Sequence, residues 1–154
     1  MQVPQFRDMG ARGRHIAPSL RVDYISDMTI RPILIHPDPR LKKAVDPVDG
    51  ITDEIRILAD DMLATMYDAP GIGLAGPQVA AMHRIITMDC SAKDADPDPM
   101  VLINPEITWS SDARNTYEEG CLSIPEQYAD VARPAEVDVR WTTLEGGEAS
   151  ARMD

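Results

Sequence analysis

Cysteine is scarce in this chain of 154 residues, which contains only Cys90 and Cys121. Two cysteines cannot form the disulfide framework of a small secreted scaffold, so we interpret both as thiols in a reducing compartment. The chain also lacks a run of about 18 apolar residues, which a transmembrane helix requires. Its N-terminus lacks the apolar stretch of a secretory signal. These absences predict a cytoplasmic protein that does not enter a membrane.

Positively charged residues are also few. The chain has 15 Lys and Arg residues against 26 Asp and Glu residues, which gives a formal net charge of -11 at pH 7. A surface of this sign repels the phosphates of nucleic acids and of anionic lipids. We therefore expect no direct binding to nucleic acid. The length suits one domain with a single hydrophobic core.

Residues 1–27 show no sustained hydrophobic periodicity and mix arginines with glycine and proline. We predict a loose N-terminal extension over 1–27 and a folded domain over 28–154. Within this domain Thr52 can cap a helix, and apolar residues then recur at helical spacing. That spacing predicts an amphipathic helix that ends near Pro70. Its apolar face would consist of Ile55, Leu58, Met62, Leu63 and Met66.

Three segments after this helix have the composition of β-strands. Residues 84–89 and 100–104 are rich in apolar and β-branched residues, and residues 137–141 alternate apolar with polar side chains. Residues 92–99 contain several Asp and Pro residues and predict an exposed loop. The expected fold class is therefore α+β, with one amphipathic helix packed on an antiparallel or mixed β-sheet.

A first stretch with chemical potential reads Gly-Ile-Gly-Leu-Ala-Gly-Pro-Gln over residues 71–78. Its glycines let the backbone approach a ligand closely, and Gln78 supplies an amide donor. On its own, such a stretch is more typical of a structural loop or a strand bulge. It is no dinucleotide fingerprint, because Pro77 and the absence of a preceding strand break the required strand–turn–helix context.

A second stretch reads Glu-Glu-Gly-Cys-Leu-Ser-Ile-Pro over residues 118–125. A lone thiol such as Cys121 is usually a small buried hydrophobe. A nucleophilic role would need a nearby His, and a metal site would need further ligands. The chain offers His15, His36 and His83, and no two of them have the i, i+4 spacing of a metal-binding helix. The residues alone leave these three readings open.

Together, the two stretches are far more specific than either one. Their order and their separation of about forty residues resemble the first two motifs of the peptide deformylase family. Further matches flank them: Pro-Asp-Pro-Arg-Leu at 37–41, Val-Leu-Ile-Asn-Pro at 101–105, and Arg-Pro at 133–134. The resemblance runs in order over about 28–144, which chance matches to short motifs would not do.

The resemblance implies hydrolysis of the N-formyl group from the formyl-methionine of new polypeptides. In that family a divalent metal, usually ferrous iron or zinc, is held by the motif cysteine and two histidines of a His-Glu-x-x-His helix. Cys121 is thereby implied as a metal ligand. The side-chain amide of Gln78 and the backbone N–H of Leu122 are implied to stabilise the developing oxyanion.

The resemblance also implies a groove for an extended peptide. Backbone groups near Gly73, Glu119 and Gly120 would hold the peptide, and Ile72 with Tyr117 would line the methionine pocket. N-terminal formyl-methionyl peptides are therefore the expected partners.

Two departures from the family pattern stand out. Gly76 occupies a position where the family usually has Ala, and the added backbone freedom is expected to loosen the placement of Gln78. The chain also reaches Asp154 before the third motif. We therefore expect a truncated domain over 28–154 that lacks the C-terminal metal-binding helix and the general base, with little turnover. An uncovered sheet face would favour self-association.

Two alternatives remain beside a weak or inactive deformylase. One is a non-catalytic relative that keeps the peptide groove and binds N-termini near the ribosome. The other is a subunit that receives its missing helix from another chain.

Overall fold

The structure is a computed structural model that describes residues 6–7, 28–92 and 94–154. The elements follow one another as β1 (Phe6–Arg7), η2 (Pro39–Lys42), α1 (Asp53–Asp68), β2 (Gly73–Ala75), η3 (Gly76–Val79), β3 (Ile85–Met88), β4 (Met100–Ser110), β5 (Arg114–Cys121), β6 (Ile124–Pro134), β7 (Val137–Thr142) and β8 (Glu148–Met153). Within the described residues α1 is the one α-helix. The predicted α+β class is confirmed.

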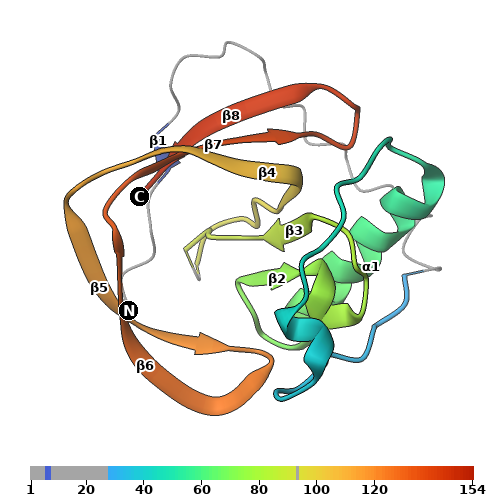
Figure 1. The fold of residues 1–154 in the computed structure, drawn as a ribbon, viewed down its shortest axis with the longest axis horizontal. Coiled ribbons are helices and arrows are strands. Elements are labelled where there is room, and N and C mark those ends of the chain that lie inside the picture. The colour runs from blue at the N-terminus through green and yellow to red at the C-terminus, as the bar shows by residue number, and fades with distance from the viewer. Residues whose placement is uncertain (1–5, 8–27, 93) are drawn as a thin grey trace.

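The strands form two sheets (Figure 1). The larger sheet has six strands in the order β1-β8-β7-β4-β3-β2, and β5 pairs with β6 in a separate two-stranded sheet. Every strand pair is antiparallel. Among the described residues, an isolated parallel bridge between Asp46 and His83 lies outside the strands. The antiparallel form of the predicted sheet is therefore the one observed.

Most of the predicted N-terminal extension lies outside the described residues. Only Phe6 and Arg7 of this region are described, and they pair with Met153 and Arg152 at the outer edge of β8. From Thr29 on, the chain is held against α1, because Asp61 accepts hydrogen bonds from the Thr29 N–H at 2.7 Å and the Arg31 side chain at 2.9 Å. The Asp61 carboxylate is buried, and its pairing with Arg31 offsets the cost of that burial.

Helix α1 begins where the sequence predicts. The Thr52 hydroxyl accepts a hydrogen bond from the Ile55 N–H at 3.4 Å, and the helix ends at Asp68, two residues before Pro70. One face of α1 is buried against β2 and β3 (Figure 1). No helix in the described part of the chain is long and apolar enough to cross a membrane.

The hydrophobic core lies between α1 and the β2–β3–β4 side of the larger sheet. Its fully buried members include Met62 and Met66 of α1 and Ile103 of β4. Asn104, next to Ile103, lies in the left-handed region with φ of 51° and marks an irregularity in the pairing of β4 with β7. The Asn104 amide bonds both backbone groups of Val48 at 2.8 Å, so it ties the segment before α1 to the sheet.

The β5–β6 hairpin lies on the opposite side of the molecule from α1 (Figure 1). Its side chains are mostly exposed. Several large apolar side chains on β4 and on the hairpin are exposed, namely Ile107, Trp109, Tyr117, Ile124 and Tyr128. An uncovered sheet face and self-association through it stay predictions.

Candidate functional site

The two sequence motifs meet at Gln78 and Cys121, although 43 positions separate them along the chain. Gln78 lies in the short helix η3, directly after strand β2. Cys121 ends strand β5, and its side chain is exposed. The Gln78 Nε2 lies 3.9 Å from the Cys121 Sγ. The predicted oxyanion donor and the predicted metal ligand therefore share one site.

The Gln78 amide is fixed at both of its polar ends. Its Oε1 accepts a hydrogen bond from the Ala75 N–H at 2.9 Å, and its Nε2 donates to the Ser123 Oγ at 3.1 Å. A backbone N–H can only donate, so the Gln78 amide oxygen must face the Ala75 N–H. The NH2 group of the same amide is thereby directed toward Ser123 and Cys121. The structure thus defines the direction in which the Gln78 amide can donate.

Ser123 is a site residue that the sequence analysis did not assign. Only 3% of its surface is exposed, and its hydroxyl accepts the Gln78 hydrogen bond. The feature of the sequence that could have indicated Ser123 is its place two residues after Cys121. A serine at such a position is also compatible with an ordinary turn, so spacing alone could not select it.

An extended segment just before η2 links the two motifs. The Leu34 N–H donates to the Gln78 carbonyl at 2.7 Å, and the His36 N–H donates to the Ser123 carbonyl at 2.8 Å. One short segment therefore fixes the backbone of both residues. This contact gives the proline-rich stretch after Ile30 a specific place beside the site.

The backbone of Gly71 closely approaches the side chain of Leu122. A Cβ atom built on Gly71 would lie 2.6 Å from the Leu122 Cδ1 and 3.3 Å from its Cγ. The first glycine of the first motif therefore leaves room for the side chain that follows Cys121. Leu122 is also packed against the hydrophobic core, which fixes the turn that carries its backbone N–H.

The structure qualifies the expectation for Gly76. A Cβ atom on Gly76 would lie 2.7 Å from the carbonyl oxygens of both Ala81 and His83. An Ala at this position would require the turn around 81–83 to move outward. The added freedom of Gly76 is thus confined by close backbone packing, and the Gln78 amide is held by its own hydrogen bonds.

The residues predicted to bind the peptide lie in β2, just before it, and in β5. Gly73 is in β2, which is an edge strand of the larger sheet. Ile72, just before it, is 66% exposed, and Tyr117 of β5 is 42% exposed. Gly120 lies under the Tyr128 ring, where a Cβ atom would lie 2.9 Å from the ring. A joint methionine pocket of Ile72 and Tyr117 stays a prediction.

Glu119 forms a two-pronged ion pair across the hairpin. The Arg133 Nε lies 2.6 Å from one Glu119 carboxylate oxygen, and its second nitrogen lies 2.7 Å from the other. These hydrogen bonds lower the pKa of the Glu119 carboxyl below its ordinary value. Arg133 was noted only as part of a flanking match. The ion pair holds the Glu119 side chain close to the strand, beside its backbone groups.

The metal site implied by the resemblance does not fit the residues that the structure describes. Among them, no group of three or more His, Cys, Asp or Glu side chains lies together in a way that could hold a metal ion. Cys121 has the amide of Gln78 as its polar neighbour, and that amide also donates to the Ser123 hydroxyl. Catalytic sites for such metals take three protein ligands. This part of the chain by itself therefore does not supply the ligand set that such a metal needs.

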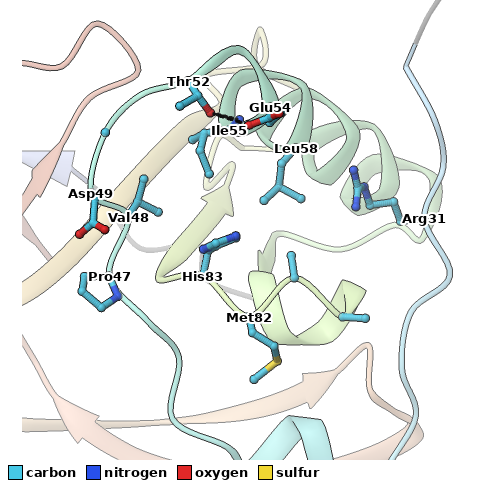
Figure 2. A pocket seen from close by; sticks show the side chains of 13 residues that line it. Arg31, Pro47, Val48, Asp49, Thr52, Glu54, Ile55, Leu58, Met82 and His83 are labelled. Atoms are coloured by element: carbon cyan, nitrogen blue, oxygen red, sulfur yellow. Dashed lines mark hydrogen bonds between the residues drawn. The ribbon is translucent and has the colours of Figure 1, made fainter.

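A separate cavity of about 600 Å³ opens near the start of α1 (Figure 2). It is bounded by 47–52, by the first two turns of α1, by Arg31 and by 80–83. Figure 2 shows Leu58 and His83 on facing walls of this cavity. Neither Gln78 nor Cys121 lines it, so it is distinct from the site formed by the two motifs.

Comparison with known proteins agrees with this geometry. The sequence model of the polypeptide deformylase family matches residues 30–154. A peptide deformylase of Nitrobacter hamburgensis is 56% identical over 123 residues, covering 77% of this chain and 70% of that protein. Two crystal structures, each 32% identical with a TM-score of 0.76, are also similar.

The first of these structures is the peptide deformylase of Ehrlichia chaffeensis in complex with actinonin, which matches 81% of this chain and 75% of that one. The second is a Met-Ala-Ser-bound class I type b peptide deformylase of Acinetobacter baumannii, which matches 81% of this chain and 84% of that one. Sequence identity and shared fold agree over most of the chain. The chain therefore belongs to the peptide deformylase family.

Proposed function

We propose that this chain binds N-terminal formyl-methionyl peptides and that its reaction is hydrolysis of the formyl amide to formate and a free amine. The observation that carries the proposal is the meeting of Gln78 with Cys121 at one exposed site. As the formyl carbon becomes tetrahedral, its oxygen gains negative charge. A fixed N–H donor at that oxygen is worth about 3 kcal/mol of transition-state stabilisation.

Gln78 and Leu122 supply the two donors in this proposal. The Gln78 amide is fixed by Ala75 and Ser123, so it does not need to reorient during the reaction. The Leu122 side chain is packed on the core and against Gly71, so its backbone N–H has a defined place in the turn after β5. Pre-orientation of this kind favours the transition state over the planar amide.

The peptide is proposed to bind as an additional extended strand. β2 is an edge strand, so an extended chain can pair along its outer side. The backbone groups that pair with the peptide would come from Gly73 of β2 and from Glu119 and Gly120 of β5. The exposed Ile72 and Tyr117 would contact the methionine side chain, because burial of about 100 Å² of apolar surface contributes roughly 2.5 kcal/mol.

Iron or zinc is proposed as the cofactor on the strength of family membership alone. Cys121 would be one ligand, and the other ligands would have to come from outside the described residues. We accordingly expect low turnover from residues 1–154 by themselves. The cytoplasm is the proposed compartment, where nascent formylated chains are the substrate.

The test is formate release from formyl-Met-Ala-Ser by the purified chain, prepared anaerobically with ferrous iron or with zinc. Peptide binding is measured in parallel by calorimetry. Gln78→Ala should weaken binding of the formylated peptide, whereas the matched variant Gln127→Ala, at an exposed position of β6, should not. A wild-type chain that neither releases formate nor binds the peptide would refute the proposal.

A second candidate function is metal-independent peptide binding, which the absence of a three-ligand cluster among the described residues favours. Binding of formyl-Met-Ala-Ser that persists unchanged in a chelator would support it. Complete loss of binding in the chelator would exclude it.

A third candidate is a subunit completed by another chain or by a second copy. It is supported by the exposed apolar side chains of β4 and the β5–β6 hairpin. Native mass spectrometry showing only monomer, alone and with ribosomes present, would exclude this third candidate.

A further inference from the structure

In the part of the chain that the structure describes, Ser123 is the buried side chain that accepts a hydrogen bond from the Gln78 NH2 group. Its exposed fraction is 3%, and its hydroxyl oxygen lies 3.1 Å from the Gln78 Nε2. Cys121, the other neighbour of this nitrogen, is exposed and lies 3.9 Å away. The stronger and better shielded contact of the NH2 group is therefore the one with Ser123.

A primary amide nitrogen carries two hydrogens in a plane, so fixing one of them fixes the other. Ala75 holds the oxygen of the Gln78 amide and thereby defines which way the group is flipped. Ser123 then takes one N–H, and the second N–H is directed toward the Cys121 side of the site. An incoming formyl oxygen can take this second N–H in place of its long contact with the Cys121 Sγ.

The backbone around both residues is already fixed by other contacts. Leu34 and His36 donate to the carbonyl groups of Gln78 and Ser123, respectively. The side-chain hydrogen bond is therefore a separate link, and removing the Ser123 hydroxyl would release the amide without releasing the backbone.

We infer that Ser123 is a positioning residue, whose hydroxyl holds the Gln78 amide so that its second N–H meets the formyl oxygen of the substrate. The inference rests on the proposed function for its consequence, but the hydrogen bond itself can be measured without substrate. It predicts that Ser123 affects recognition of the formyl group and has little effect on the rest of the peptide.

The first measurement is the NMR signal of the Gln78 side-chain amide in the full chain. Ser123→Ala should move the resonance of the Ser123-facing proton toward that of the exposed Gln127 amide, because a hydrogen-bond acceptor is lost. Ser123→Thr keeps the hydroxyl and should restore the wild-type position. An unchanged Gln78 signal in Ser123→Ala would overturn the inference, whatever the peptide does.

The second measurement compares the affinities for formyl-Met-Ala-Ser and Met-Ala-Ser by calorimetry. Ser123→Ala should lower the preference for the formylated peptide about fivefold, the size of one net hydrogen bond. Ser123→Thr and the control Ser150→Ala, at an exposed position of β8, should keep that preference. The free terminal amine of Met-Ala-Ser contributes the same difference in affinity for every variant. It therefore cancels when the preference of a variant is compared with that of the wild-type chain.

The outcomes separate the two claims. A wild-type chain without preference for the formyl group refutes the proposed function, and the NMR result still decides the role of Ser123. A wild-type preference that Ser123→Ala retains in full refutes the positioning role and leaves the proposed function standing.

Discussion

Replacement of Asn104 tests how the segment before α1 is attached to the sheet. The Asn104 Oδ1 accepts from the Val48 N–H, and its Nδ2 donates to the Val48 carbonyl, both at 2.8 Å. Val48 is 9% exposed and belongs to the core, so Asn104→Ala leaves two largely buried backbone groups without partners. Two lost hydrogen bonds with their desolvation cost destabilise the fold by about 3 kcal/mol.

Backbone conformation adds to this loss. Asn104 has φ of 51°, a left-handed conformation that Asn tolerates and Ala adopts at a cost of about 1 kcal/mol. We therefore expect Asn104→Ala to lower the free energy of unfolding by about 4 kcal/mol. Asn104→Gly loses the same hydrogen bonds without the conformational cost, so it should be about 1 kcal/mol more stable than the Ala variant.

Urea unfolding followed by circular dichroism measures these differences. The matched control is Asn115→Ala, at an exposed position of β5, which should change the unfolding free energy by less than about 0.5 kcal/mol. An Asn104→Ala variant within about 1 kcal/mol of wild type, at an unchanged slope against urea, would refute the reasoning.

Three further outcomes follow from the site. Gly71→Ala should displace the flexible end of Leu122 at a loss of stability below about 1 kcal/mol. It should also weaken the binding of formyl-Met-Ala-Ser measured by calorimetry, and an unchanged affinity would contradict this. Arg133 lowers the pKa of the Glu119 carboxyl in the folded chain. The ionised carboxylate therefore stabilises the fold at pH values above its pKa in the unfolded chain, and this contribution is lost as the pH falls through its pKa in the folded chain. Glu119→Gln should therefore be less stable than wild type at pH 7, with a difference that shrinks in acid, and a difference independent of pH in thermal melts would argue against the ion pair. Cys121 is exposed, so Cys121→Ala should leave the urea midpoint almost unchanged, and a loss above about 1 kcal/mol would show a structural role.

Local patterns in the sequence were sufficient for the elements that have one buried face. Thr52 and the helical spacing of apolar residues predicted α1, because capping and amphipathicity act within a few residues. The strands at Ile85–Met88 and Val137–Thr142 were predicted for the same reason. The hairpin of β5 and β6 was missed, since its side chains are mostly exposed and leave no alternation of apolar and polar residues.

By itself, the sequence determined the family, the fold class and the identity of Gln78, Leu122 and Cys121 as candidate residues, because short motifs carry that information in order along the chain. Only the tertiary structure decided that Ser123 holds the Gln78 amide and that 34–36 joins the two motifs. These contacts link residues more than forty positions apart. A hydrogen bond between distant segments depends on how the whole chain folds, and a single sequence carries no local pattern for it.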